Sequence, residues 1–259
     1  MKKPKLINII GIITVIFILI PLIMIAITAF GNADIIRFPI DSFTTKWFFK
    51  VFESRSFMES LKTSLLLGLI ASFLGIVFAL PTAYALYKMK GRFSKHLLSF
   101  FLSPNLIPGI VLGIMLYRII VLNFQLNLEL ALVIGHLLLV LPYSIRVLSS
   151  GLKEFDPNIE EAAISLGATR GKAFYLTIMP YLKNSILAAF MMSFINSFNN
   201  LPVSMYLKGP GVNTLPVTLM NYIEYNFDPS VSALSLILMV FTFLLMRFMD
   251  RVLGIKKVM

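Results

Sequence analysis

The residues of this sequence that could do chemistry gather in two short stretches, and neither has the composition of a catalytic centre. One stretch, from Asp156 to Lys172, combines carboxylates with basic side chains. The other, from Ser193 to Ser204, is rich in hydroxyls and amides. The sequence has no cysteine and lacks the HExxH and GxSxG patterns of metalloproteases and serine hydrolases. We therefore expect no catalytic residue and no metal site in this chain.

The charged stretch predicts a short helix and a turn. Asp156-Pro157 is a helix-start signal, because proline fits the first helical position. Glu160 and Glu161 follow in the first turn, where carboxylates complement the positive end of the helix dipole. Gly167 is expected at the position that ends this helix, where glycine adopts a left-handed conformation at little cost.

A second short helix is expected after the turn, with its end at Pro180. The adjacent small residues Ala162 and Ala163 would suit docking of the first helix into a groove of a partner. The run Gly167–Lys172, GATRGK, resembles a phosphate-binding loop, but that loop needs four residues between its glycines and Ser or Thr after the lysine. Here three residues separate the glycines and Ala173 follows, so we expect no nucleotide or other cofactor on this chain.

The second stretch is the most polar part of an otherwise apolar segment. Buried amides and hydroxyls are costly in an apolar environment unless they are paired, so they should face a helix-bundle interior or a cavity. Two explanations remain open: these side chains bond between helices, or they line a path for a solute. The candidate path residues are Asn196, Ser197, Asn199 and Asn200.

The elements that position both stretches are membrane-spanning helices. Of the 259 residues 58% are hydrophobic and 14% are charged, which excludes a water-soluble globule and a disordered chain. A span needs about 20 mostly apolar residues. We predict an all-α membrane protein that forms one domain over residues 1–259. Its six spans are expected at about 6–30, 63–87, 97–118, 129–149, 184–207 and 229–248, with a cytoplasmic loop at about 150–183.

The basic residues predict the orientation of these spans. With both termini inside, the inner segments hold 16 of the 23 Lys and Arg, and the whole net charge of +11 lies on the cytoplasmic side. This distribution explains the basic balance without nucleic-acid binding. The basic N-terminus and the long run from Leu6 to Phe30 favour a retained first span over a cleaved signal peptide.

Three features inside or beside the spans have competing explanations. Pro104 and Pro108 predict a kink in the third span, which serves either packing or a translocation path. His136 in the fourth span is expected to make an interhelical hydrogen bond rather than to relay protons, because no Asp or Glu lies within a span apart from Glu129 at the edge of the fourth. Trp47 is either an anchor at the membrane surface or part of a packed cap.

On its charged loop the sequence resembles a known family, the permeases of ABC-type importers. Glu161-Ala162-Ala163, then Gly167 and finally Pro180 match the family's EAA loop in order and spacing. The usual ending of that motif is Ile-x-Leu-Pro, and Thr177-Ile178-Met179-Pro180 departs from it mildly at two positions. The resemblance implies a type I ABC importer permease fold. It also implies that the loop contacts an ATPase through Glu160, Glu161, Ala162, Ala163, Gly167, Ala168 and Pro180.

Most of the chain resembles the polyamine-type branch, the spermidine/putrescine permease C subunit group. The segments FPIDSFTTKWF, SPNLIPGIVLGI, HLLLVLPYSIRV and KGPGVNTLPVTLMNYI carry this likeness. It implies a bacterial inner or plasma membrane protein that is not itself an enzyme. Its expected partners are a second, homologous permease subunit, a dimer of ATPase subunits that binds the ATP, and an extracytoplasmic solute-binding protein.

The solute implied by this branch is a polyamine such as spermidine or putrescine, taken up with ATP. Many polyamine permeases have acidic residues where this chain has Asn199-Asn200, and a dication should prefer carboxylates along its path. Aminoethylphosphonate, thiamine and ferric iron, which related permeases carry, therefore remain alternatives. A secondary transporter independent of ATP and a membrane-embedded enzyme are further alternatives. Apart from His136, the ionisable and catalytic residues that they need are missing from the spans.

Overall fold

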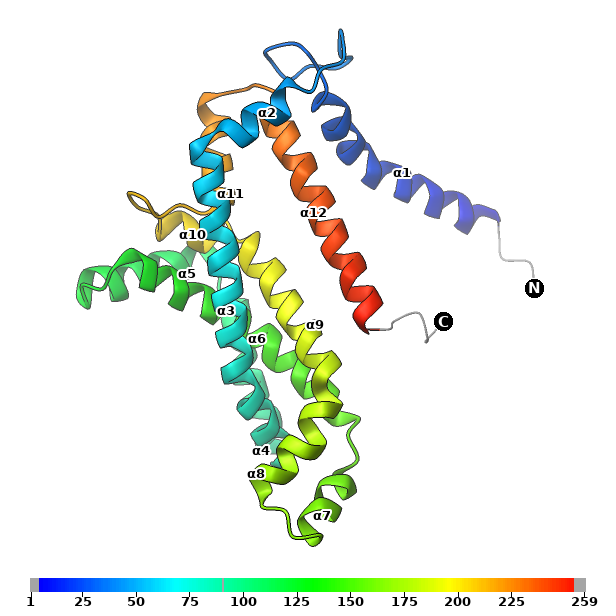
Figure 1. The fold of residues 1–259 in the computed structure, drawn as a ribbon, viewed down its shortest axis with the longest axis vertical. Helices are drawn as coiled ribbons and strands as arrows, with labels where there is room; N and C mark the ends of the chain where they lie inside the picture. The colour runs from blue at the N-terminus through cyan, green and yellow to red at the C-terminus, as the bar shows by residue number, and fades with distance from the viewer. Residues whose placement is uncertain (1–4, 90, 254–259) are drawn as a thin grey trace. The chain divides into compact units, whose positions relative to one another are not determined.

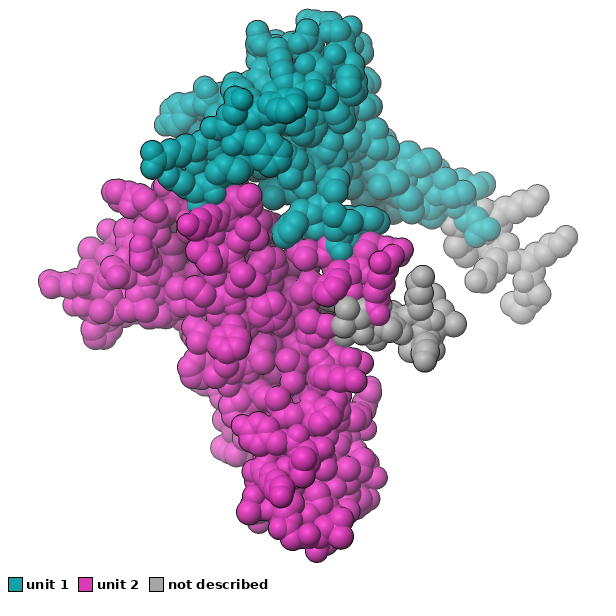
Figure 2. Space-filling view, viewed as in Figure 1, with its two compact units in different colours: residues 1–59, 218–244 teal, residues 60–217, 245–259 magenta. Residues whose placement is uncertain are grey.

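The computed structural model describes residues 5–89 and 91–253. In these ranges the chain is almost entirely helical and forms no strand, only two isolated β-bridges (Figure 1). It divides into two compact units, residues 1–59 with 218–244 and residues 60–217 with 245–259 (teal and magenta in Figure 2). Lys2, Lys3, Lys90, Lys256 and Lys257, which contribute to the predicted inner charge, lie outside the described residues.

The prediction of an all-α membrane protein is confirmed in the described part of the chain, which has five or six candidate spans. Five helical stretches are long and apolar enough to cross a membrane, and a bent pair of shorter ones completes six if it counts as one span. The five are α1 (Lys5–Thr28), α3 (Arg55–Lys88), α6 (Leu128–Lys153), the continuous helix Arg170–Phe198 that contains α8 (Arg170–Ala173), η3 (Phe174–Ile178) and α9 (Met179–Phe198), and α12 (Ser230–Leu253).

The bent pair replaces the kinked third span. Its arms are Arg92–Leu106, with α4 (Arg92–Leu102) and η1 (Ser103–Leu106), and Gly109–Asn123, with α5 (Gly109–Leu116) and η2 (Tyr117–Asn123). They meet at 89°. The bend falls at Ile107-Pro108, where both residues are extended, because the residue before a proline avoids the helical region.

Small residues on α5 explain the packing around this bend. A Cβ atom on Gly109 would lie 2.9 Å from Cβ of Pro202, and one on Gly113 would lie 3.2 Å from Cα of Val203. Both contacts are to α10 (Pro202–Tyr206). Glycine allows this close approach of the two helices, so the region packs against α10 as the first of the two explanations requires.

The fifth span ends earlier than predicted. Helix α9 stops at Phe198 rather than near Leu207, and the short helix α10 follows after a break. Asn200 explains the break, because its side-chain oxygen accepts a hydrogen bond from the Val203 amide at 3.1 Å. An amide that bonds to the backbone in this way favours helix starts over helix interiors.

The expectation that Pro180 ends the second short helix is wrong. Pro180 lies in the first turn of α9, and the helix runs through it from Arg170. The turn before it, η3, is π-helical. In a regular α-helix a proline ring clashes with the carbonyl group four residues earlier, and the wider π turn relieves that conflict. The segment between the fourth and fifth spans is therefore about 154–169, shorter than the predicted 150–183.

Unit 1 contains a packed cap around Trp47. This residue lies on α2 (Lys46–Glu53) and is 4% exposed. Its indole nitrogen donates a hydrogen bond to the Gly31 carbonyl at 2.7 Å. The cap explanation therefore accounts for Trp47 better than an exposed anchor at the membrane surface.

Asp228, between α11 (Leu215–Tyr225) and α12, is the centre of a hydrogen-bonded cluster in unit 1. Its carboxylate accepts hydrogen bonds from Lys50 Nζ at 2.6 Å and from the Tyr222 hydroxyl at 2.8 Å. Partial burial would by itself raise the pKa of Asp228, but the bonds from Lys50, Tyr222 and Ser230 outweigh it and hold that pKa below its ordinary value of 3.8. The same contact raises the pKa of Lys50 above its ordinary 10.5.

Candidate functional site

The charged loop forms the helix and turn that its sequence predicts. Helix α7 spans Pro157–Ser165, and the Asp156 side chain accepts a hydrogen bond from the Asn158 amide at 3.0 Å. Gly167 has φ +91°. The amides of Gly167 and Ala168 bond to carbonyl groups in the last turn of α7 at 2.9 and 3.1 Å, the Schellman arrangement that satisfies a helix end. The expected helix start and the glycine end are both confirmed.

Helix α7 carries its side chains in an unusual arrangement. Glu160 is 1% exposed, whereas Ile159 is 49% and Leu166 is 89% exposed. Glu161 and Ala162 are exposed as well. Burial normally favours apolar side chains and excludes unpaired charge. An exposed apolar surface on a short peripheral helix is typical of a contact site for another molecule.

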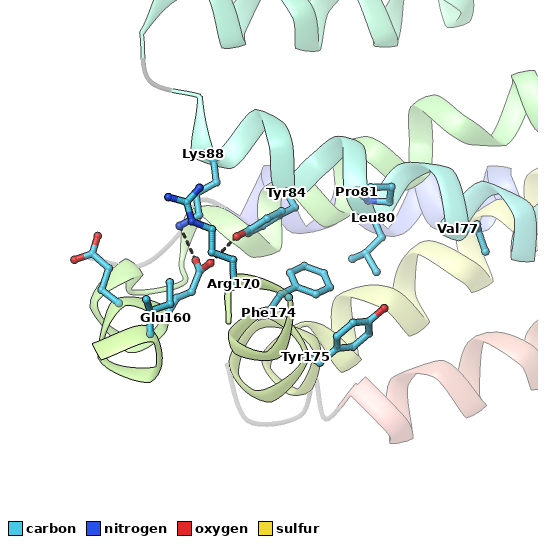
Figure 3. A pocket seen from close by; sticks show the side chains of 12 residues that line it. Val77, Leu80, Pro81, Tyr84, Lys88, Glu160, Arg170, Phe174 and Tyr175 are labelled. Atoms are coloured by element: carbon cyan, nitrogen blue, oxygen red, sulfur yellow. Dashed lines mark hydrogen bonds and ion pairs between the residues drawn. The ribbon is translucent and has the colours of Figure 1, made fainter. Parts of the chain in front are cut away.

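The buried carboxylate of Glu160 is held by the last turns of α3. The Tyr84 hydroxyl donates a hydrogen bond to Oε1 at 2.5 Å, and Lys88 Nζ lies 2.7 Å from Oε2 (Figure 3). Close by, the Tyr87 hydroxyl donates to the Phe155 carbonyl at 3.3 Å. Because both carboxylate oxygens have a partner, the charge of Glu160 is compensated where it is buried.

A groove of about 900 Å³ lies beside this contact. Figure 3 shows Val77, Leu80 and Pro81 of α3 along one side, with Phe174 and Tyr175 opposite. The Tyr84 and Phe174 rings meet edge to face with centroids 4.9 Å apart. The described residues contain no cluster of three or more His, Cys, Asp or Glu side chains that could hold a metal ion. The lining of the groove offers apolar contact together with the charges of Lys88, Glu161 and Arg170.

The predicted coupling residues lie in two places. Glu161, Ala162 and Gly167 are on the exposed side of α7 and its turn, and Ala163 and Ala168 are half-buried beside them. Pro180 is separate from this group, since it belongs to the continuous helix that leads into α9.

A second polar site lies where α6 and α9 pack, and we call it the polar seam: His136, Ser144, Ser193, Ser197 and Ser204. All five residues are at most 2% exposed. His136 Nδ1 is 2.7 Å from the Ser197 hydroxyl and Nε2 is 2.9 Å from the Ser204 hydroxyl. The Ser144 and Ser193 hydroxyls are 2.8 Å apart. The expected interhelical hydrogen bond of His136 is confirmed, and it joins both sides of the α9–α10 break.

The seam separates the four candidate path residues. Ser197 is engaged by His136, and Asn200 caps α10. Asn196 is half-buried and Asn199 is exposed. Bonding between and within helices therefore accounts for Ser197 and Asn200, whereas Asn196 and Asn199 retain surface that could meet a solute.

Sequence reasoning missed Tyr84 and Lys88. Their partner Glu160 is 76 residues from Tyr84 along the chain, so no local pattern reports the contact. One signal was available: Tyr84 and Lys88 are polar residues four positions apart, so they lie on the same face of an apolar helix.

Comparison with known proteins places this geometry in a family. Residues 71–253 match the family model described as "Binding-protein-dependent transport system inner membrane component". The chain is 28% identical over 233 residues to the spermidine/putrescine transport system permease protein PotC of Escherichia coli K12, with 86% of this chain and 84% of that protein covered. It is 24% identical to the putrescine transport system permease protein PotI of the same strain, with 86% and 82% covered.

Two solved structures share the fold. One is a chain of a bacterial ABC transporter involved in the import of the acidic polysaccharide alginate, with a TM-score of 0.73 and 15% identity over 97% of this chain and 98% of the other. The other belongs to an amino acid ABC transporter, with a TM-score of 0.55 and 21% identity over 82% of this chain and 97% of the other. The predicted fold of a type I importer permease is thereby confirmed.

Proposed function

The chain belongs to the binding-protein-dependent transport system inner membrane component family, and on that premise we propose that α7 is the helix through which an ATPase drives it. The chain is a multi-pass permease subunit of an ABC importer in the bacterial inner membrane, and its family is one of transport subunits rather than enzymes. ATP would bind and be hydrolysed on a separate ATPase chain, so this chain would need no cofactor of its own.

The observation that carries this proposal is the exposed apolar side of α7. Leu166 is 89% exposed at the end of a helix whose one buried side chain is a carboxylate. A partner that covers Ile159, Ala162 and Leu166 would remove apolar surface from water, which favours association by about 25 cal/mol per Å². Glu161 beside them would add a charged contact. Of these residues, the EAA resemblance assigns Glu161 and Ala162 to ATPase contact.

The remaining partners follow from the same premise. A second permease subunit, homologous but different, would complete the pore, and an extracytoplasmic binding protein would deliver the solute. The basic loops would place α7 on the cytoplasmic side. Closure of the ATPase dimer would then move α7 and switch the pore between its two states.

We propose a polyamine as the solute, because the relatives PotC and PotI are named for spermidine and putrescine. Asn196 and Asn199 would line its path through their exposed surface, with Ser197 and Asn200 supporting them from the packed side. Amides bind ammonium groups as hydrogen-bond acceptors without a full charge. Because uncharged amides select less strongly for a dication than carboxylates would, aminoethylphosphonate, thiamine and ferric iron remain alternative solutes.

Uptake of labelled spermidine and putrescine by cells with and without this chain tests the solute. Unlabelled aminoethylphosphonate and thiamine in excess serve as competitors. We expect polyamine uptake that depends on the chain and stops when cellular ATP is depleted. Unchanged polyamine uptake would reject the solute and leave the permease assignment standing, whereas uptake that an ion gradient drives without ATP would reject the coupling through α7.

A further inference from the structure

We propose that Glu160 is a positioning residue that ties α7 to the end of α3, and that it does not contact the ATPase. The proposal rests on the proposed function, because it assigns α7 the coupling role. It divides the adjacent glutamates between two tasks: Glu161 faces the partner, and Glu160 transmits the partner's movement into the permease.

Glu160 has no surface to offer a partner. The residue is 1% exposed, and both carboxylate oxygens are engaged, by Tyr84 at 2.5 Å and by Lys88 at 2.7 Å. Glu161, next in the sequence, is exposed. Any protein that docks on α7 would therefore meet Glu161 first and would need to break two charge-assisted contacts to reach Glu160.

The contact between Glu160 and α3 also has a defined geometry. Tyr84 and Lys88 are four positions apart, so they lie one turn apart on one face of α3. A carboxylate that bridges them fixes both the distance and the rotation of α3 relative to α7. The Tyr84 ring also packs against Phe174 of η3, so three elements meet at this point (Figure 3).

The path of the chain separates α7 from α3. Helix α7 is joined covalently to α6 through residues 154–156 and to α8 through residues 166–169. Helix α3 is distant in sequence, and the Glu160 contact links it to α7 across 76 residues. A displacement of α7 therefore reaches α6 and α9 through the backbone. It reaches α3 directly through this carboxylate, beside the Tyr87–Phe155 hydrogen bond that holds the start of the loop.

Spin labels can measure the tie directly, because the chain has no native cysteine. We would introduce Ala85→Cys on α3 and Ser165→Cys on α7, both at exposed positions, and measure the distance distribution between two nitroxides in the purified transporter. Glu160→Gln keeps the shape of the side chain but removes its charge. Glu154→Gln is the matched control, since Glu154 is an exposed carboxylate in the same loop.

We expect Glu160→Gln to widen the distribution at least about twofold and to abolish its shift on addition of ATP, while ATPase co-purification stays within about twofold of the unaltered chain. Glu154→Gln should change neither quantity. Glu161→Gln should lower ATPase recovery without widening the distribution. Adding Tyr84→Phe to Glu160→Gln should widen it no further, because residues of one contact act non-additively.

Two results would overturn the tie: an unchanged distribution in Glu160→Gln, or a loss of ATPase recovery equal to that of Glu161→Gln. An independent, additive effect of Tyr84→Phe would also contradict it. Failure of the proposed function looks different, because no ATPase would then accompany even the unaltered chain. The distance between α3 and α7 could still be measured in that case.

Discussion

Helix α7 and the polar seam place polar side chains in opposite ways. In α7 one carboxylate is buried and the apolar residues Ile159 and Leu166 are exposed. In the seam the hydroxyls and the imidazole are buried, and they bond to one another across α6, α9 and α10. The seam satisfies its own groups, whereas α7 leaves apolar surface uncovered.

Because of this difference, substitutions in the two regions should affect different properties of the protein. Changes in the seam should act on the stability of the helix bundle, because buried donors and acceptors that lose their partners are costly. Changes on the outer side of α7 should act on assembly and transport while the fold persists, since exposed side chains make few contacts within the chain. The comparison therefore predicts opposite outcomes for stability and for transport in the two regions.

The largest expected effect is on the apolar side of α7. Leu166→Asp should reduce ATP-driven uptake at least about tenfold, because burying an unpaired carboxylate in a protein contact costs several kcal/mol. The thermal midpoint of the purified chain should stay unchanged, since Leu166 is 89% exposed. Leu166→Met is the conservative control and should retain uptake. A large loss of stability in Leu166→Asp would show that this surface is already covered within the chain.

Substitutions of Gly167, in the turn after α7, should give the next largest loss of uptake. Gly167 has φ +91°, and a Cβ atom there would meet nothing within 4 Å. Any cost of substitution is therefore backbone strain, about 1–3 kcal/mol for a residue that avoids this region. Uptake assays should show a severe loss for Gly167→Val and a mild one for Gly167→Asn, because asparagine tolerates positive φ better. Equal losses would contradict the conformational explanation.

Substitutions in the polar seam should lower the free energy of unfolding. His136→Leu leaves the Ser197 and Ser204 hydroxyls without their imidazole partner, and we expect about 1–3 kcal/mol of destabilisation. His136→Gln, which keeps a donor and an acceptor, should cost less. Unfolding in detergent measures both. If His136→Leu abolished uptake and left stability unchanged, the seam would be part of the transport path rather than a packed joint.

The smallest expected effect is the pH dependence of the stability of unit 1. It is a reference for the comparison, because unit 1 contains neither α7 nor the polar seam. The lowered pKa of Asp228 stabilises unit 1 above about pH 4, and this contribution is lost as the pH falls through the folded-state value. The raised pKa of Lys50 gives a contribution that is present below about pH 10.5 and is lost as the pH rises through the folded-state value.

Trp47 is the one tryptophan of the sequence, and Lys50 Nζ lies 5.0 Å from its ring centroid. Its fluorescence can therefore follow the cap during acid titration. Asp228→Asn should flatten the acid limb of that titration. An unchanged acid limb would show that another group governs it.

Local signals made α7 predictable. Asp156, Pro157 and Gly167 act through their own backbone, so their roles can be recognised without knowledge of the fold. The number of apolar spans was predictable for the same reason, because the hydrophobic length of a segment is a property of that segment.

The features that escaped prediction depend on partners far along the chain or on competing local effects. Glu160 was expected as a charge of the first helical turn and, by resemblance, as an ATPase contact, and only the fold brings Tyr84 and Lys88 to it. Pro180 was expected to end a helix because proline usually interrupts one. The π-helical turn that accommodates it has no signal in the sequence. The right-angled bend at Pro108 was expected as a kink, but its size depends on packing against α10.

The central claim is that the exposed side of α7 binds an ATPase, and co-purification from native membranes tests it most directly. A tagged chain would be isolated beside its Glu161→Ala and Gly167→Val variants, and the bound proteins would be identified by mass spectrometry. The account predicts that an ATPase accompanies the unaltered chain and is depleted in both variants. An unaltered chain without an ATPase, or variants that retain it in full while transport continues, would contradict the account.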